Sequence, residues 1–196
     1  MEYDIYDFDK TVYPYDSETV FLFYSMLTHP LLWFLIPYQI VCITLYALGA
    51  GDRFKGRCFV FLRFTDGEKL VEKFWKKQVK NIYPIFKKEK RNFPTLVCSA
   101  SPEYLVRPLC EKFGVEKVIA TRADIKDGVI IGRNCIRQEK VRRIREEMPS
   151  AVFRRVVSDD LQNDIYIFGL GRECYTAKKG TLTKTDYKEI KAKYNG

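Results

Sequence analysis

The sequence predicts an α/β fold in which a parallel sheet is flanked by helices and carries an inserted all-helical module. Two observations lead to this prediction. In the first and last parts of the chain, short apolar segments of β-rich composition alternate with segments of helical periodicity, which is typical of parallel strands joined by right-handed crossovers. Residues 16–92 break this alternation, because their apolar runs have helical length or spacing.

Five segments are expected to form the sheet. Each is short, rich in β-branched, aromatic or other apolar residues, and followed by turn, hydroxyl or acidic residues. They are residues 3–8, 95–98, 118–121, 153–157 and 174–177. Residues 138–147 are expected to form a basic helix, and residues 181–196 a polar, helical tail. Ser101, Pro102 and Glu103 are interpreted as the N-cap and first turn of a helix that stops at Gly114.

The inserted segment begins with Ser17, interpreted as the N-cap of a helix that opens at Glu18. No Asp, Glu, Lys or Arg occurs in residues 19–51, and residues 31–48 are mostly apolar. A run this long qualifies as a membrane span, but Pro30 and Pro37 interrupt it. We therefore expect the apolar helix to form the centre of a helical bundle with residues 54–64 and 68–80. The alternative is a bundle that dips into a bilayer.

The composition limits the classes of function. The 196 residues suffice for one domain with an insert, and the net charge of +9 suits anionic partners such as phosphorylated small molecules or anionic lipid. No nucleic-acid-binding motif is present, so no nucleic acid is expected. Six cysteines without a Cys-x-x-Cys pair argue against zinc and disulfides, and the single histidine argues against a Ser-His-Asp triad.

Two carboxylates and a hydroxyl follow the first predicted strand: Asp7, Asp9 and Thr11. Alternate residues of a strand point the same way, so a loop just past the strand can aim Asp7 and Asp9 into one pocket. Two like charges this close are costly unless a cation or a shared proton relieves them. The pattern indicates a divalent metal site, a phosphate site or both, with an acidic turn as the alternative.

Three further polar features lie where a parallel sheet would gather them. Ser99 ends the second predicted strand, Lys140 lies in the basic helix, and the acidic cluster 159–164 follows the fourth predicted strand. Functional residues of such sheets lie in a crevice at the carboxyl ends of the strands. We therefore expect Asp7, Ser99 and Asp160 to converge there.

In this order the four motifs resemble those of the haloacid dehalogenase superfamily phosphatases, in the subclass with a helical cap. Residues 134–141, Asn-Cys-Ile-Arg-Gln-Glu-Lys-Val, are similar to the Asn-Cys-x-Gly-x-Glu-Lys-Val of phosphoserine phosphatase-like proteins, with Arg137 in place of glycine. The apolar insert also resembles that of the phosphatidylglycerophosphatase C family. The resemblance implies a Rossmann-like catalytic core of residues 1–15 and 93–196, and a helical cap of residues 16–92.

The resemblance also implies the role of each motif. Asp7 would be the nucleophile that forms an aspartyl-phosphate. Asp9 would be the general acid and base. Ser99, with the amide of Ala100, would donate hydrogen bonds to a phosphoryl oxygen, and Lys140 would neutralise the phosphate and the Asp7 carboxylate.

Two residues are further candidates for contact with the substrate. Thr11 would hold the first loop, or is a simple turn hydroxyl. Glu18 lies where some relatives contact substrate, although a helix dipole equally favours an acidic residue there.

The same resemblance implies a Mg²⁺ site, since Mg²⁺ prefers a few carboxylates, waters and the substrate phosphate. The site has no histidine or cysteine cluster, which favours Mg²⁺ over Zn²⁺. Asp159 is an alternative ligand, because the Ser-Asp pair at 158–159 stands where relatives have Gly-Asp or Ser-Asp. The implied ligands are Asp7, the backbone carbonyl of Asp9, Asp160 and, as its support, Asp164.

The sequence therefore predicts a Mg²⁺-dependent phosphomonoester hydrolase that acts through an aspartyl-phosphate intermediate. Its substrate is expected to be a phosphorylated small molecule or a lipid. A membrane-associated lipid-phosphate phosphatase and a non-catalytic phosphate-binding protein remain as alternatives. The first residues are acidic and already strand-like, so no signal peptide is expected and the predicted location is cytoplasmic, or peripheral to the membrane. The sequence does not predict an oligomeric state.

Overall fold

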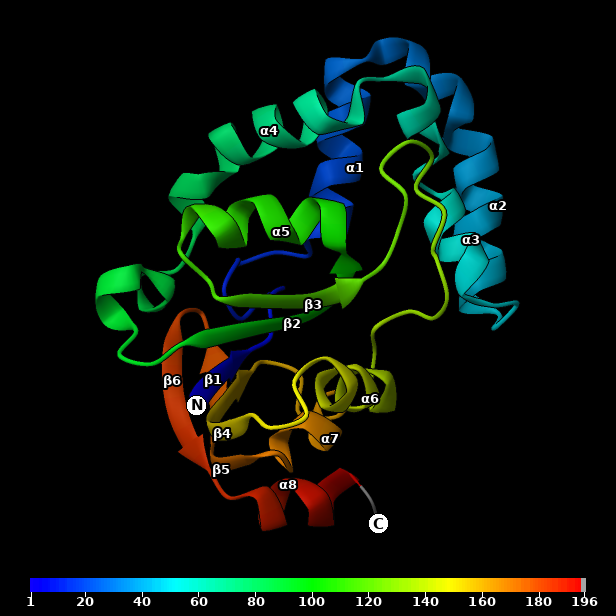
Figure 1. The fold of residues 1–196 in the computed structure, drawn as a ribbon. Helices are drawn as coiled ribbons and strands as arrows, with labels where there is room; N and C mark the ends of the chain where they lie inside the picture. The colour runs from blue at the N-terminus through cyan, green and yellow to red at the C-terminus, as the bar shows by residue number, and fades with distance from the viewer. Residues whose placement is uncertain (195–196) are drawn as a thin grey trace.

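The computed structural model of the chain describes residues 1–194. Within them, six strands form one sheet: β1 (Glu2–Tyr6), β2 (Thr95–Pro102), β3 (Lys117–Thr121), β4 (Val152–Ser158), β5 (Gly171–Lys178) and β6 (Thr181–Thr185). Their order across the sheet is β3-β2-β1-β4-β5-β6, and every neighbouring pair is parallel except β5 and β6 (Figure 1). The predicted α/β fold is confirmed, and β1 lies inside the sheet between β2 and β4.

Helices cover both faces of the sheet, because the strands are apolar on both sides. Along β2, Val97 packs into the layer that contains α5 (Glu103–Lys112), whereas Leu96 and Cys98 pack into the opposite layer. That second layer is closed by α6 (Gln138–Glu147), α7 (Ile165–Phe168) and α8 (Tyr187–Tyr194). The alternation of side chains along the strand thus separates two hydrophobic cores.

The expected helical tail is wrong in its first part. Residues 181–185 form β6, which pairs antiparallel with β5 through a tight turn at Lys179 and Gly180, both with positive φ. A two-residue turn with positive φ at both positions matches the twist of a hairpin, and the alternating threonines of β6 favour a strand. Only α8 of the tail is helical, and residues 195–196 lie outside the described part.

Four α-helices and intervening 3-10 turns lie between β1 and β2. They are α1 (Ser17–Thr28), α2 (Ile36–Ala47), α3 (Asp52–Arg57) and α4 (Gly67–Gln78). The N-cap of α1 is Asp16, not Ser17, because the Asp16 carboxylate accepts a hydrogen bond from the amide of Thr19 at 2.8 Å. The Ser17 amide instead donates to Asp9.

The expected helix over residues 54–64 is split into α3 and a 3-10 turn, Val60–Phe64. Phe59, just before the turn, and Phe61 within it are buried and pack with Phe21 of α1, which in turn packs with Phe74 of α4. This aromatic cluster is the centre of the helical insert. The predicted helix over 68–80 is confirmed as α4, whose buried residues are Leu70, Val71, Phe74 and Trp75.

The apolar segment 31–48 does not form the centre of the bundle, and that expectation is wrong. It folds as a 3-10 turn, Pro30–Leu35, followed by α2. Only Leu32, Gln39 and Cys42 of the segment are buried, and most of its other large apolar side chains are exposed. The buried centre of the insert is formed instead by the phenylalanines around α3. By length and composition alone, residues 30–47 could cross a membrane.

Candidate active site

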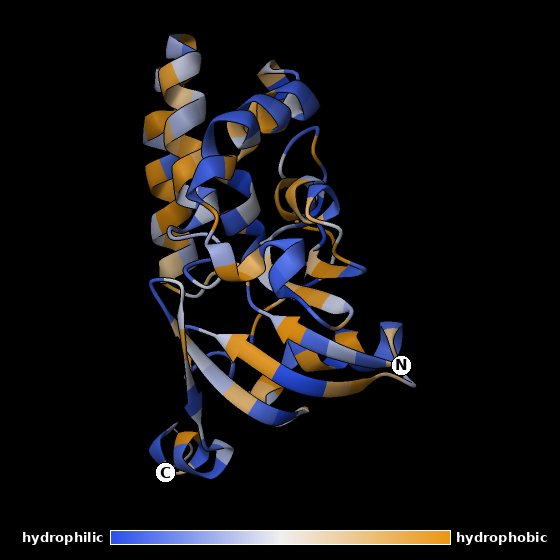
Figure 2. Cartoon of the chain, turned by 90° about the vertical axis from the view of Figure 1, so that its left-hand side faces the viewer, coloured by the Kyte–Doolittle hydropathy of each residue, from blue (hydrophilic) through white to orange (hydrophobic). Residues whose placement is uncertain are grey.

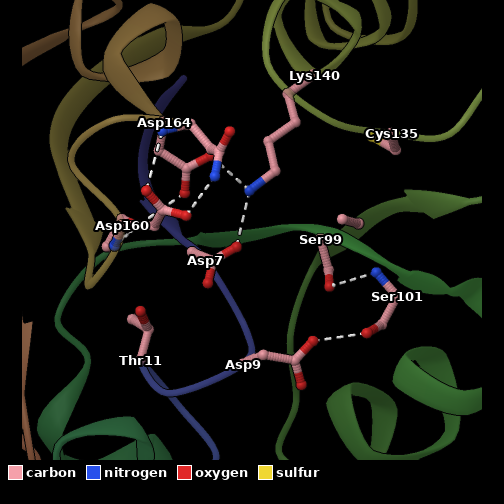
Figure 3. Close-up of polar contacts among 12 residues, drawn as sticks. Asp7, Asp9, Thr11, Ser99, Ser101, Cys135, Lys140, Asp160 and Asp164 are labelled. Carbon is pink, nitrogen blue, oxygen red and sulfur yellow. Dashed lines mark hydrogen bonds and ion pairs between the residues drawn. The ribbon is translucent and has the colours of Figure 1, made fainter. Parts of the chain in front are cut away.

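The loop after β1 carries the first pair of carboxylates. The Asp7 amide donates to the carbonyl oxygen of Val157 in β4 at 2.9 Å, which holds the loop against the neighbouring strand. Lys10 has a φ of 58°, so the chain turns sharply just after Asp9. This turn brings the Ser17 amide to Asp9 Oδ1 at 2.8 Å. In Figure 3, the Asp7 side chain contacts Lys140 and the Asp9 side chain contacts Ser101.

Lys140 bridges two buried carboxylates. Its Nζ lies 2.7 Å from Asp7 Oδ1 and 2.7 Å from Asp164 Oδ1, and the lysine is only 3% exposed. Burial alone would lower the pKa of Lys140, but Asp164 and Asp7 outweigh it and raise that pKa, so the amine stays a cation. The predicted contact between Lys140 and Asp7 is present (Figure 3).

Asp164 is held from both sides by the protein. Lys140 donates to its Oδ1, and Ser158 at the end of β4 donates to its Oδ2 at 2.6 Å. Both oxygens thus have strong partners, and Asp164 fixes the position of the Lys140 amine. Its role as support for a metal ligand stays a prediction.

Ser101 is a polar residue of the site that the sequence interpretation assigned wrongly. It does not cap α5, because β2 continues through Pro102 and Pro102 itself occupies the N-cap position. The Ser101 hydroxyl donates to Asp9 Oδ2 at 2.5 Å, and its amide donates to Ser99 Oγ at 3.0 Å. Ser99 and Ser101 lie two residues apart on β2, whose register with β3 shifts between Ser99 and Pro102, and both are buried. Their Ser-x-Ser spacing was the signal present in the sequence.

The environment of Asp9 suits a proton carrier. Burial raises its pKa, and the hydrogen bonds from Ser101 and Ser17 partly oppose that rise. A carboxyl group whose pKa moves upward can hold a proton closer to neutral pH, as a general acid must. The Asp7 carboxyl is also raised in pKa by burial, but there Lys140 opposes the rise and favours the ionised form.

The acidic loop after β4 keeps Asp159 and Asp160 in different places. Asp159 Oδ1 accepts from the hydroxyl of Thr11 at 3.2 Å, and the Asp159 amide donates to that hydroxyl at 2.9 Å. Thr11 is fully buried, so it ties the first loop to the fourth, as one of its predicted roles requires. Asp160 accepts from the amides of Gln162 and Asn163 and from the Asn163 side chain at 2.6 Å.

Glu18 and Ala100 meet at Lys55, a residue of α3 that sequence reasoning did not single out. The Lys55 Nζ lies 2.8 Å from Glu18 Oε2 and donates to the Ala100 carbonyl oxygen at 2.8 Å. Burial raises the pKa of Glu18 to about 7, against the opposing effect of Lys55. A lysine far along the chain could not be paired with Glu18 from sequence alone.

Arg137 occupies the position where the motif has glycine, and its backbone shows why glycine is usual there. Its φ is 53° and its ψ −124°, a conformation that costs a residue with a side chain about 1–3 kcal/mol. The Arg137 Nε donates to Asn163 Oδ1 at 2.9 Å. Arg137 also lines a groove of about 1080 Å³ along α6, which neither Asp7 nor Asp9 lines. The Asp7 and Asp9 carboxylates therefore lie outside that groove.

The comparison with known proteins gives the family of the chain. The family model of haloacid dehalogenase-like hydrolases matches residues 5–169, which is most of the chain. The chain belongs to the haloacid dehalogenase-like hydrolase family. The predicted superfamily and the prediction of an enzyme are thereby confirmed, and the helical insert is consistent with the helical-cap subclass. No curated protein matches the sequence.

Several solved structures share the fold of this hydrolase. A protein of unknown function from Bordetella pertussis Tohama I has a TM-score of 0.64 at 17% identity, over 81% of this chain and 82% of that chain. A phosphoserine phosphohydrolase-like protein from Francisella tularensis subsp. tularensis SCHU S4 has a TM-score of 0.55 at 14% identity, over 89% and 86%. A probable phosphoserine phosphatase from Vibrio cholerae has 0.61 at 11%, over 90% and 56%. At these identities the likeness shows the fold.

The donor set of this hydrolase fits a hard cation. Lys140 occupies only Oδ1 of Asp7, and in residues 1–194 no hydrogen-bond donor contacts its Oδ2. The other possible metal ligands nearby are carboxylate and carbonyl oxygens, which Mg²⁺ prefers. The described chain holds no ready cluster of three or more His, Cys, Asp or Glu side chains. A cation here would thus depend on few protein ligands, together with water and substrate, as is usual for Mg²⁺.

Proposed function

We propose that the chain is a Mg²⁺-dependent phosphomonoester hydrolase that acts through an aspartyl-phosphate on Asp7. The observation that supports this most is the bridge from the Lys140 amine to Asp7 Oδ1 at 2.7 Å, next to an Asp7 Oδ2 that is free to react. A buried carboxylate kept anionic by a fixed cation is suited to attack a phosphorus atom. Asp9 lies two residues away with a raised pKa, as the acid of the same reaction requires.

In the first half of the reaction, Asp7 Oδ2 attacks the phosphorus and the bond to the leaving oxygen breaks. Asp9 gives that oxygen its proton, and the alcohol departs. In the second half, Asp9 accepts a proton from water, whose oxygen attacks the phosphorus and releases phosphate from Asp7. Lys140 remains a cation beside Asp7 throughout, and the Ser99 hydroxyl and Ala100 amide are proposed to donate to the phosphoryl oxygens.

Mg²⁺ would be held by Asp7, the backbone carbonyl of Asp9 and Asp160, with Asp164 in support and Asp159 as the alternative to Asp160. Bound there, it would supply positive charge that offsets the charge of the transferred phosphoryl group. Asp160 keeps acceptor capacity for this role, because the Asn163 amide group is the only donor to its Oδ2 in the described chain.

We propose the same division of the chain as the sequence indicates, with a core of residues 1–15 and 93–196 and a cap of residues 16–92. The proposed cap would contribute Glu18 and Lys55 to the edge of the site, which is supported by the hydrogen bond from Lys55 to the Ala100 carbonyl oxygen. These two residues and Thr11 are the proposed contacts or supports for the substrate. A degenerate, non-catalytic phosphate-binding protein is less consistent with the intact Lys140 bridge.

The proposed substrate is a phosphorylated small molecule, in a cytoplasmic protein that binds no nucleic acid. A lipid phosphate is the second candidate, because the apolar segment of residues 30–47 is only 17% buried. This second candidate also requires that the protein lie at the periphery of the membrane.

The experiment is a hydrolysis screen of soluble and lipid phosphate esters, with and without added Mg²⁺. The wild type should hydrolyse a generic aryl phosphate only with Mg²⁺, and Asp7→Asn should remove that activity while its circular dichroism and unfolding midpoint stay close to those of the wild type. Undiminished turnover by folded Asp7→Asn would rule out the aspartyl-phosphate mechanism.

A further inference from the structure

The helical insert exposes one continuous set of large apolar side chains, which we call the cap apolar face. These residues lie on α1, the 3-10 turn Pro30–Leu35, and α2 with its C-cap residue, and Phe34 and Leu31 are 86% and 81% exposed. Apolar colour recurs along these helices in Figure 2. Large exposed apolar patches mark interaction sites. The face comprises Phe23, Leu27, Leu31, Trp33, Phe34, Ile36, Tyr38, Ile40, Val41, Ile43 and Leu48.

The segment is not a core helix of a soluble protein. Residues 30–47 have a mean hydropathy of 1.6, yet only 17% of them are buried. Leu32, Gln39 and Cys42 alone form the buried stripe of the segment. The remaining faces of α2 are apolar and open, so packing within the described chain does not account for its composition.

Several polar side chains of α1 and of this segment are already satisfied within the chain. Ser25, Thr28 and Thr44 each donate a hydrogen bond to a carbonyl oxygen one turn earlier in their own helix. Trp33 Nε1 donates to the Met26 carbonyl oxygen at 3.0 Å, and Gln39 Nε2 to that of Cys58 at 3.0 Å. A segment buried in hydrocarbon must satisfy its polar groups in this way, whereas a segment in water need not.

The charges next to the cap apolar face favour an anionic binding partner. Residues 19–51 contain no Asp, Glu, Lys or Arg. Asp52 comes next, and its carboxylate accepts a hydrogen bond from the Asn134 amide at 3.0 Å. Arg53 and Arg57 then lie over the Phe54 ring, with guanidinium carbons 4.9 and 5.5 Å from its centre, and no ion pair of either is present in residues 1–194. A second copy of the chain would bring the same net charge of +9, so electrostatics disfavour self-association and favour anionic lipid.

The connections of the segment exclude a simple span. α1 precedes it and α3 follows it, and the ion pair between Glu18 of α1 and Lys55 of α3 joins them at 2.8 Å. Lys55 also touches the Ala100 carbonyl oxygen of the catalytic core. Both flanking helices are therefore anchored on the core side, and the apolar segment can enter a bilayer only from that same side. This is the geometry of an interfacial element.

We propose that the cap apolar face docks into one leaflet of an anionic bilayer, with Arg53 and Arg57 at the level of the headgroups. Docking itself does not depend on the proposed catalytic activity. Its consequence for the substrate, a preference for phosphate esters carried by lipids, rests on the proposed phosphatase function.

The test is flotation of the full-length protein with vesicles of equal parts phosphatidylglycerol and phosphatidylcholine, against vesicles of phosphatidylcholine alone. The wild type should float with the anionic vesicles and much less with the neutral ones. The double variant Ile40→Glu/Val41→Glu should lower the partition coefficient at least tenfold, since two buried aliphatic groups are lost. Arg53→Gln/Arg57→Gln should lower it about 30-fold at low salt, from two lost headgroup attractions.

The matched control is Val129→Glu/Ile131→Glu, which places two acidic residues at exposed apolar positions of the loop after β3. It should bind vesicles like the wild type. Asp7→Asn should also bind the anionic vesicles like the wild type. The docking result can therefore be interpreted even if the catalytic proposal fails. Hydrolysis of a soluble aryl phosphate should be unchanged in the cap variants, which shows that they remain folded.

Three results would overturn the docking proposal. The wild type stays at the bottom of the gradient with both kinds of vesicle, or it floats equally with anionic and neutral ones. Alternatively, it forms a dimer in sedimentation that Ile40→Glu/Val41→Glu dissociates, which would make the face a contact between copies of the chain.

Discussion

Replacing Lys140 with methionine should strongly destabilise the fold as well as remove activity. The substitution keeps the length and apolar stem of the side chain but deletes the cation that lies 2.7 Å from both Asp7 and Asp164. Asp7 is 8% exposed and Asp164 is 2% exposed, so water does not replace the lost partner. Two carboxylates are then buried without a counter-ion.

The size of the effect follows from this burial. Removing one partner of a buried ion pair costs about 3–5 kcal/mol of unfolding free energy. The cost depends on pH, because burial raises the pKa of Asp7 above its unfolded value and the opposing effect of Lys140 is lost in the variant. Stability of the variant is then present at low pH and is lost as pH rises through the raised pKa of Asp7. The deficit relative to wild type should be larger at about pH 8 than at about pH 5.

The assay is urea unfolding of both proteins at the two pH values, with Lys73→Met as the control. Lys73 is an exposed lysine of α4, and its loss should leave the unfolding midpoint almost unchanged. An unfolding free energy for Lys140→Met within about 1 kcal/mol of wild type would refute the reasoning, because it would mean that the bridge does not compensate the buried carboxylates. A deficit that grows toward acid pH would refute the sign of the linkage.

Four further outcomes are expected. Arg137→Gly should raise the unfolding free energy by about 1 kcal/mol in thermal or urea unfolding, since relief of the positive φ exceeds the loss of an exposed hydrogen bond; a lower value would show that the contact with Asn163 dominates. Glu18→Gln should gain stability relative to wild type as pH rises from about 5 to about 8, by up to about 3 kcal/mol of unfolding free energy. The reason is that a pKa raised to about 7 makes ionisation of folded Glu18 costly. A difference in melting temperature that does not change with pH would contradict this. Ser101→Ala should move the pH–rate profile to higher pH, because the hydrogen bond that lowers the Asp9 pKa is lost, and an unmoved profile would separate Ser101 from the chemistry. Asp160→Ala should weaken activation by Mg²⁺ more than Asp159→Ala does, and the reverse order in a Mg²⁺ titration would make Asp159 the ligand.

Local patterns in the sequence were enough to predict most of the sheet and the first motif. The strand before Asp7, the strand before Ser99 and the helix over 138–147 each have their own periodicity and end signals, so they need no distant partner to be recognised. The meeting of Asp7 with Lys140 followed from the resemblance to a family, because 133 residues separate them along the chain.

The missed features depend on contacts that composition does not encode. Lys55 became part of the site only through the packing of α3 beside Glu18. Ser101 was missed because its sequence position also suited the N-cap of the following helix. The apolar segment of residues 31–48 has the composition of either a buried or a lipid-facing helix. The phenylalanines around α3 filled the centre of the insert, and that outcome of packing left α2 outside.

The central claim is that Asp7 becomes phosphorylated during turnover, and the most direct measurement is to trap that species. The enzyme would be mixed with Mg²⁺ and an aryl phosphate, quenched in acid within one turnover, digested and analysed by mass spectrometry. The account predicts a phosphoryl group on the peptide that contains Asp7, assigned to that residue by fragmentation and absent from Asp7→Asn. Substrate turnover with no phosphorylated peptide, or with the phosphoryl group on Asp9 or another residue, would contradict it.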